Sequence, residues 1–239
     1  MEERKLRLQP RLQMLANMIP QGARLADVGT DHGYLPVWLL QEGRIRRAIA
    51  SDINAEPLAH ARRTAEAYGT AEAMDFRLCA GLDGIVPGEA DVVVIAGMGG
   101  ETICAILEAA PWLRDGAELL LQPMTKTEEL RAWLSASGYR LLEERLVEDK
   151  DFLYPILRTA GGTMPPMNDE ELWAGRLLES DPLWGRYLTQ QQGRIQKRLD
   201  GLRRARREAD AGELLRLEKL YMALEGRKER WNREHGTRD

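Results

Sequence analysis

A chain of 239 residues, 44% hydrophobic and 30% charged, has an ordinary globular composition and is long enough for one large domain or one domain with an appendage. No run of about 18 apolar residues occurs, which argues against a membrane helix, and the first residues lack the apolar core of a signal peptide. Two cysteines outside any motif predict a reducing, cytoplasmic setting, and three histidines without metal-ligand spacing predict no metal site.

The net charge of −4 conceals an uneven distribution. Residues 1–185 contain 19 Lys/Arg and 29 Asp/Glu, a net charge of −10, whereas residues 186–233 contain 14 and 7, a net charge of +7. A basic C-terminal segment that follows an acidic body indicates contact with a polyanion such as a nucleic acid. A solvated helical face gives the same pattern, so the charge alone does not decide between the two interpretations.

Strand-like and helical segments alternate through the first two thirds of the chain, after an amphipathic helix over residues 8–19. The expected strands are 24–28, 48–51, 75–78, 91–96 and 118–122, and the expected helices are 34–42, 55–68, 100–110 and 127–137. This alternation predicts an α/β fold with a doubly wound, mostly parallel sheet and helices on both faces. Strand-like runs at 139–147 and 152–158 predict a hairpin that places an antiparallel strand on the sheet edge.

The glycine- and proline-rich segment 160–166 predicts a boundary between a first domain, residues 1–160, and a second, residues 161–239. A helix is expected from about Asn168 to Glu179, with Asn168 or Asp169 as its cap. Beyond Pro182 the pattern is purely helical, with two apolar stripes joined near residues 209–212. The stripes predict an antiparallel, coiled-coil α-helical hairpin that closes on itself or pairs with another chain, with its basic residues off the packed face.

The segment from Asp27 to Tyr34 follows the first strand and precedes a helix, the place where parallel α/β sheets bind cofactors. A dinucleotide fingerprint would require glycines at 29, 31 and 34, but Asp31 and Tyr34 occupy two of these positions. The remaining pattern, acidic-x-Gly-x-x-x-Gly with Gly29 and Gly33, is the form used by S-adenosylmethionine-dependent methyltransferases. A nicotinamide oxidoreductase is therefore disfavoured.

Further cofactor contacts are expected where the next strands end. Asp27 would orient the cofactor, and Asp52 at the end of the second strand would accept hydrogen bonds from ribose hydroxyls. A turn-forming aspartate and a helix cap are the structural alternatives for these two residues. The complete expected cofactor set is Asp27, Gly29, Asp31, Gly33, Asp52, Ile53, Ala80, Gly81, Leu82, Ala96, Gly97 and Met98.

The segment 95–100 follows the fourth strand, where amino methyltransferases acting on adenine N6 usually place Asn/Asp-Pro-Pro-Tyr/Phe. This chain has Ile-Ala-Gly-Met-Gly-Gly there, with no carboxamide or aromatic side chain. Methylation of an exocyclic amine by that route is disfavoured. The glycines would instead let the backbone come close to the cofactor and a base.

Four segments together resemble one family: Asp-Val-Gly-Thr-Asp-His-Gly-Tyr-Leu-Pro at 27–36, Ala-Gly-Met-Gly-Gly at 96–100, Leu-Gln-Pro at 121–123 and the hairpin at 147–154. This combination is similar to the bacterial tRNA (adenine-N1)-methyltransferases that modify position 22. The resemblance runs from about Leu8 into the C-terminal helices. The chain departs from the family pattern at Ala80, where an aspartate is expected, and at Met124, where asparagine is common.

The resemblance implies a Rossmann-like methyltransferase domain, S-adenosyl-L-methionine as methyl donor, and tRNA held partly by the helical hairpin. Adenine N1 has a lone pair and no proton to lose, so positioning matters most. Asp31 and His32 are the candidate catalytic residues, which would accept from the N6 amine, offset the product's positive charge or bind phosphate. The candidate substrate contacts are Tyr34, Gln122, Pro123, Arg203, Arg204, Arg206 and Arg207.

Three alternatives stay open. A methyltransferase for another RNA base, a small molecule or a protein would have the same donor motif. Its turnover would survive removal of the basic hairpin if the substrate were not RNA. A non-catalytic module that binds the donor or RNA would show binding without methyl transfer.

Overall fold

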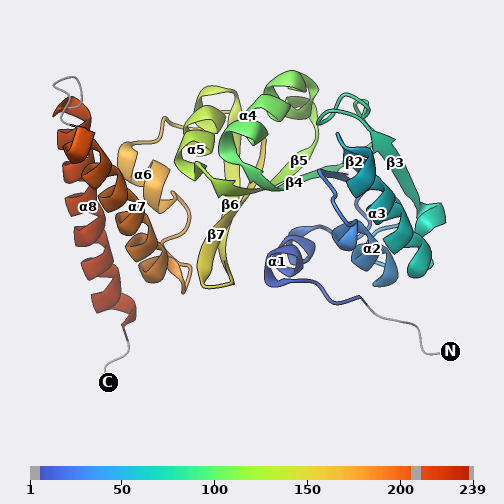
Figure 1. Cartoon of the computed structure of the whole chain (residues 1–239), viewed down its shortest axis with the longest axis horizontal. Coiled ribbons are helices and arrows are strands. Elements are labelled where there is room, and N and C mark those ends of the chain that lie inside the picture. Colours follow the sequence, from blue (N-terminus) through green and yellow to red (C-terminus); the bar gives the residue numbers. More distant parts are fainter. Residues whose placement is uncertain (1–5, 206–210, 237–239) are drawn as a thin grey trace. The chain divides into compact units, whose positions relative to one another are not determined.

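The computed structural model describes residues 6–205 and 211–236, which form two compact units divided after residue 166 (Figure 1). The sequence-based boundary after residue 160 lies at the end of the last strand of the first unit, which continues to Gly161, a few residues before the division between the units. Arg206 and Arg207, two of the expected RNA contacts, lie outside the described residues. Across the described segments, no helix is long and apolar enough to cross a membrane.

The first unit contains a seven-stranded sheet in the order β3-β2-β1-β4-β5-β7-β6. The strands are β1 (Leu25–Val28), β2 (Ala48–Asp52), β3 (Met74–Leu78), β4 (Val92–Gly99), β5 (Glu118–Thr125), β6 (Tyr139–Asp149) and β7 (Phe152–Gly161). The α-helices are α1 (Pro10–Met18), α2 (Tyr34–Gln41), α3 (Ala55–Ala67), α4 (Gly100–Ala109) and α5 (Thr127–Ala136), and 3₁₀ helices are η1 (Ala71–Ala73) and η2 (Pro111–Asp115). The predicted doubly wound, mostly parallel sheet is confirmed.

The terminal hairpin is confirmed, but its antiparallel strand is not at the edge. β7 pairs antiparallel with both β5 and β6, so it lies second from the edge and β6 is the outer strand. The two-residue turn Lys150–Asp151 has φ values of 49° and 65°, the left-handed conformation that a tight hairpin turn requires. The sequence predicted the hairpin but not which of its strands would join β5.

Alternating side chains of the central strands divide the core into two layers. Val92 and Val94 of β4 pack with α1 and α2 on one face, whereas Val93 and Ile95 pack with α4 and α5 on the other. Both faces of this parallel sheet are therefore buried, as continuous apolar strands imply. Figure 1 shows α1, α2 and α3 on one side of the sheet and α4 and α5 on the other.

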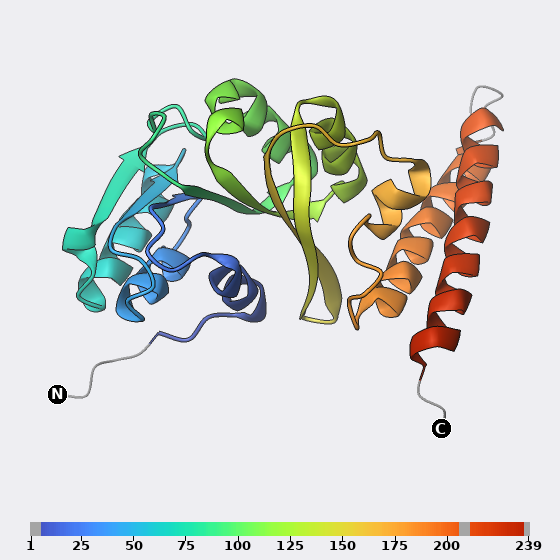
Figure 2. The ribbon, with the colours of Figure 1, turned by 180° about the vertical axis from the view of Figure 1, so that it is seen from behind.

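The second unit is helical. It contains α6 (Asp169–Ala174), α7 (Trp184–Ala205) and α8 (Ala211–His235). Asn168 caps α6 through a reciprocal capping box with Glu171, and the helix ends at Ala174 rather than at 179 as expected. Figure 2 shows α7 and α8 side by side.

The pairing between α7 and α8 is antiparallel. Trp184 at the start of α7 contacts Trp231 near the end of α8, and Arg198 forms an ion pair with Glu213 near the start of α8. The predicted stripes face each other, since Leu188, Ile195 and Leu199 of α7 and Leu217 and Leu224 of α8 are buried. These side chains form the packed interface of the helical pair.

Candidate functional site at the carboxyl ends of the strands

The turn after β1 is the centre of the candidate site. Gly29 and Gly33 have φ values of 73° and 68°, a region that side chains other than glycine rarely adopt. The backbone N–H groups of Gly29 and Thr30 donate to the carbonyl of Ser51 at 2.8 and 3.0 Å. These bonds fasten the turn to β2 and hold it against the adjacent strand end.

Asp27 is buried directly beneath this turn, with 6% of its surface exposed. Its carboxylate accepts a 2.6 Å hydrogen bond from the Thr30 hydroxyl. Burial raises the pKa of Asp27 to about 6, the Thr30 hydrogen bond opposes this rise, and the nearby charge of Asp52 adds to it. The site therefore holds a carboxylate whose charge is costly until a cation or donor group reaches it.

Asp52 ends β2 and accepts a 2.8 Å hydrogen bond from the backbone N–H of Asn54. The helix-cap alternative weighed for Asp52 is not what the structure shows, because Asn54 is the N-cap residue of α3. The partly exposed Asp52 side chain keeps further acceptor capacity. The next side chain, Ile53, is 66% exposed although it is apolar. A carboxylate beside an exposed apolar side chain suits a ligand with both hydroxyl groups and a flat apolar ring.

The loop after β3 lies next to Asp52, because the backbone N–H of Cys79 donates to the Asp52 carbonyl at 3.0 Å. Ala80 is exposed in this loop, whereas Leu82 is buried in the core. Gly81 has a φ of 50°, and a Cβ there would lie 3.1 Å from Ile106. Ligand contacts from Ala80, Gly81 and Leu82 stay a prediction, and in this structure the Leu82 side chain packs in the core while Gly81 lies against Ile106 of α4.

The fourth strand extends beyond its expected end at residue 96, so that residues 96–99 of the glycine-rich segment belong to β4 and Gly100 begins α4 as the expected helix does. The register shifts at Ala96 and Met98, and Met98 pairs with Pro123 while Gly99 pairs with Thr125. This bulge aims the Met98 methyl group at the place where a Cβ of Gly29 would be. The first and fourth strand ends therefore meet. Beside Gly97, whose φ is 79°, a Cβ would have no other atom within 4 Å, so the space there is open.

Asp31 and His32 lie at the exposed tip of the β1–α2 turn. Asp31 has a φ of 49°, and its carboxylate is 3.7 Å from His32 Nε2. The side chains are 71% and 42% exposed, so both reach the surface above the strand ends. Tyr34, the first residue of α2, is 38% exposed beside them. The structure thus gathers these three predicted residues at one rim.

Gln122 and Pro123 are buried, in contrast to the tip residues. The Gln122 carboxamide accepts a 3.1 Å hydrogen bond from Arg11 Nη1 and donates a 3.1 Å bond to the Pro123 carbonyl. Arg11 also donates to Asp149 at 2.6 Å. The role of Gln122 and Pro123 in substrate binding stays a prediction, and the Gln122 side chain contributes here to a network that joins α1, β5 and β6.

Sequence reasoning missed Arg11. It is 111 residues from Gln122 and 138 from Asp149, so no local pattern could connect the three. The family resemblance begins at about Leu8, and this was the only indication in the sequence that the first helix contributes to the site.

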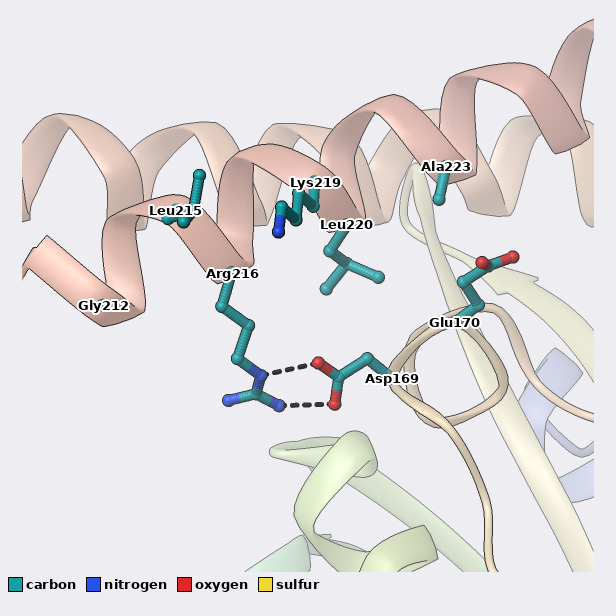
Figure 3. A pocket seen from close by; sticks show the side chains of 8 residues that line it. All are labelled: Asp169, Glu170, Gly212, Leu215, Arg216, Lys219, Leu220 and Ala223. Carbon is teal, nitrogen blue, oxygen red and sulfur yellow. Dashed lines mark hydrogen bonds and ion pairs between the residues drawn. The ribbon is translucent and has the colours of Figure 1, made fainter.

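In the second unit, Arg203 and Arg204 are exposed near the end of α7. Arg203 forms a 2.7 Å ion pair with Glu218, and Arg204 donates to the carbonyl of Asp200 at 3.0 Å. An open hollow of about 390 Å³ lies between α6 and α8, where Arg216 donates two 2.6 Å bonds to Asp169 (Figure 3). Arg216 thus links α8 to α6. Arg203 and Arg204 make contacts within the α7–α8 pair and are exposed to solvent.

No cluster of metal-ligating side chains occurs within residues 6–205 and 211–236. The chemistry available at the strand ends comes from carboxylates, backbone groups and aromatic rings. This donor set suits an organic cation with hydroxyl groups.

Comparison with known proteins agrees with this geometry. A family model described as a methyltransferase domain matches residues 8–157. The tRNA (adenine(22)-N(1))-methyltransferase of Bacillus subtilis (strain 168) is 35% identical over 192 residues, which cover 80% of this chain and 79% of the relative. A putative tRNA methyltransferase of Mycoplasma pneumoniae is 34% identical over 153 residues, 62% of this chain and 68% of the relative.

Solved structures extend the similarity to both units. The crystal structure of the B. subtilis m1A22 tRNA methyltransferase TrmK matches with a TM-score of 0.83 and 30% identity, covering 94% of this chain and 100% of that one. A putative tRNA (m1A22) methyltransferase of Streptococcus pneumoniae, solved in complex with S-adenosyl-L-methionine, matches with a TM-score of 0.77 and 31% identity over 91% and 98%. This chain therefore belongs to the methyltransferase-domain proteins and, within them, to the tRNA (adenine(22)-N(1))-methyltransferase family.

Proposed function

We propose that this protein transfers a methyl group from S-adenosyl-L-methionine to N1 of adenine 22 in tRNA. The single observation that carries the donor half is the buried carboxylate of Asp27 beneath the β1–α2 turn, close enough to Asp52 at the end of β2 for their charges to interact. The acceptor half follows from family membership, since the B. subtilis relative is named for methylation of adenine 22.

The residues present fit this donor. S-adenosyl-L-methionine supplies a methyl group on a positively charged sulfonium, next to an ammonium, a carboxylate, a ribose and an adenine. Asp27 offers negative charge that is unfavourable without a cation, because burial raises its pKa to about 6 and the nearby charge of Asp52 adds to that rise. Asp52 has acceptor capacity for ribose hydroxyls, and exposed Ile53 provides an apolar surface for the adenine ring.

The remaining donor contacts are assigned to backbone groups. The N-terminus of α2 after Gly33 has no side-chain cap, and the partial positive charge of a helix N-terminus suits the donor's carboxylate. The open space beside Gly97 lets a ligand approach the β4 backbone closely. Ala80 offers no carboxylate for the adenine amine, so we assign that contact to the backbone of the 79–82 loop.

The acceptor chemistry suits a site with few ionisable groups. N1 of adenine attacks with its own lone pair, so the enzyme has no proton to remove before the transfer. The product base is cationic, and the exposed carboxylate of Asp31 is suitably placed to offset that charge. We therefore assign to Asp31 and His32 the positioning of the base, which supplies much of the rate enhancement in such transfers.

Within the second unit, we assign the tRNA grip to the arginine cluster near the end of α7, Arg203 and Arg204. Arg203 and Arg204 are exposed, and phosphate contacts from such side chains position an RNA without reading its sequence. The target base lies within folded RNA, so it must leave its stack to reach the strand ends. We infer that the protein acts in the cytoplasm as a monomer or weak homo-oligomer.

The decisive experiment is mass spectrometry of nucleosides from unmodified tRNA incubated with the protein and S-adenosyl-L-methionine. The proposal predicts 1-methyladenosine, and a tRNA with adenine 22 replaced by guanosine should give none. Another methylated base would preserve the donor assignment and refute the acceptor. Donor binding without methylation of any tRNA would refute catalysis and favour a binding module.

A further inference from the structure

Three aromatic rings form a row at the rim of the candidate site. The ring of His32 lies between two others, 5.2 Å from Tyr34 at an interplanar angle of 9° and 5.0 Å from His60 at 20°. These centroid distances are within the range of offset-stacked aromatic pairs. Tyr34 and His32 belong to the sequence motif after β1, but His60 comes from the second turn of α3.

The close packing of two helices brings His60 to this position. A Cβ at Gly33 would lie 3.0 Å from the Cβ of Ala61, so the absence of a side chain lets the start of α2 lie directly against α3. His60 precedes Ala61 and is thereby set beside His32. Gly33 thus has a packing role in addition to its left-handed φ of 68°.

The turn that presents His32 is held in an unusual conformation. Asp31 has a φ of 49°, which costs free energy for a residue with a side chain. The Gly33 N–H donates to the Thr30 carbonyl at 2.8 Å, and the turn is also bonded to Ser51. Such strain is retained where surrounding contacts fix the backbone, and here it fixes the base of the ring row.

The row is exposed. Tyr34 is 38% exposed and the His32 side chain 42%, so neither belongs to the hydrophobic core. Exposed aromatic rings in a row offer a flat face on which unstacked RNA bases can stack. The row lies at the same strand ends as Asp27 and Met98, where the proposed transfer occurs.

We propose that His60 is a positioning residue for methyl transfer: by stacking on His32 it holds the His32–Tyr34 pair flat, as a platform for an unstacked base of the RNA substrate. The inference rests on the proposed function, and it adds a residue from outside the family-like motif. His60 itself acts through His32.

The test compares His60→Ala, which removes the third ring, with His60→Phe, which keeps an aromatic ring without ionisable nitrogen. His235→Ala is the matched control, because His235 stacks on Trp231 at 4.9 Å in the second unit. Steady-state methylation of unmodified tRNA gives kcat and KM, and calorimetry gives the Kd for S-adenosyl-L-methionine. All three proteins should fold, since each change removes or replaces one surface ring.

His60→Ala should lower kcat about 2- to 10-fold, the range expected for losing one aromatic pair. The KM for tRNA and the Kd for the donor should change less than about twofold, because phosphate contacts and the donor pocket are untouched. His60→Phe should restore most of the rate, and His235→Ala should match the wild type. An unchanged kcat in His60→Ala, or equal losses in His60→Ala and His60→Phe, would overturn the inference.

A second readout does not depend on activity. The chain has three histidines, so ¹³C-histidine labelling gives three ring signals that single substitutions assign. His60→Ala should shift the His32 signal, because it removes the ring current of its neighbour, and His235→Ala should leave it unchanged. A His32 signal that does not shift in His60→Ala would overturn the positioning role of His60. Absence of methylation by the wild-type protein would refute the proposed function separately.

Discussion

The strand ends of the first unit and the basic end of the α7–α8 pair use charge in different ways. At the strand ends a few groups are fixed by backbone hydrogen bonds, and Asp27 is buried with a raised pKa. On the helical pair the arginines are exposed and form ion pairs with acidic side chains, as Arg203 does with Glu218. Donor recognition should therefore depend steeply on single residues, whereas RNA recognition should be spread over many screened charges.

The largest effect expected from this comparison is the loss of donor binding in Asp27→Ala. Removing the only buried carboxylate beneath the β1–α2 turn, among the residues described there, takes away a charge-assisted contact to a cation, worth about 10- to 100-fold in affinity. Calorimetry with S-adenosyl-L-methionine measures this change, and nucleoside analysis should show loss of 1-methyladenosine. Glu56→Ala, an exposed carboxylate in the first turn of α3, is the matched control. Equal donor affinity in Asp27→Ala and the wild type would show that Asp27 is only a turn residue.

A smaller loss is expected from charge reversal at the hairpin. Arg203→Glu combined with Arg204→Glu should weaken tRNA binding about tenfold and lower the slope of log K against log salt by roughly 1 to 2, since each phosphate contact contributes about 0.7 to 0.9. Donor affinity should stay unchanged. Arg230→Glu, an exposed arginine near the other end of α8, provides one charge reversal of the same kind away from the cluster, half the charge change of the double variant. If Arg230→Glu weakened binding as much per charge, overall charge and not this cluster would govern the interaction.

The pKa of Asp27 gives a pH prediction with a defined sign. Below a pKa of about 6 the carboxylate becomes protonated, so donor affinity should fall about fourfold between pH 7 and pH 5.5. The stability change has the opposite sign: the folded-state pKa is raised, so burial of the charge costs roughly 3 kcal/mol above pH 6, and this cost disappears between pH 6 and about pH 4.

Asp27→Asn separates these two effects. Its donor affinity should be low and nearly independent of pH over this window, and its free energy of unfolding at pH 8 should exceed that of the wild type. Calorimetry at pH 7 and pH 5.5 measures the donor affinity, and urea denaturation at pH 8 measures the free energy of unfolding. A wild-type donor affinity that is flat from pH 7 to pH 5.5 would contradict the assignment of the charge to donor binding.

The smallest effect expected is that of Ile53→Ala. The side chain is 66% exposed, and covering it with the adenine of the donor should contribute on the order of 1 kcal/mol, about a threefold to fivefold change in donor Kd. Val86→Ala removes a similarly exposed aliphatic side chain, 59% exposed, from another loop of the same unit and should leave the Kd unchanged. Equal Kd values for Ile53→Ala and the wild type would place the adenine elsewhere.

Local sequence was sufficient for the elements and the motif. Apolar strands such as 92–95 alternate with amphipathic helices. The spacing of apolar residues within each segment indicates whether it is a strand or a helix, so each element can be predicted from its own residues. The glycines at 29 and 33 likewise indicated a tight turn, which their positive φ values confirm. The sequence narrowed the cap of α6 to Asn168 or Asp169 for the same reason, since a capping box spans only four residues, and the structure selects Asn168.

The register of β4 and the place of β7 could not be read in this way. The bulge at Ala96–Met98 depends on pairing with β5, and the interior position of β7 depends on competition between β6 and β7 for β5. Both are set by partners more than twenty residues away. The packing role of Gly33 against Ala61 and of Gly81 against Ile106 was hidden for the same reason.

The sequence by itself determined the alternation of strands and helices, the donor motif and the separation of an acidic body from a basic helical segment, because each of these depends on neighbouring residues or on composition. Only the tertiary structure joined Arg11 to Gln122 and Asp149, buried Asp27 beside Asp52, and stacked His60 on His32. These contacts link residues that are distant in the chain, and their geometry follows from how the helices and strands pack against one another.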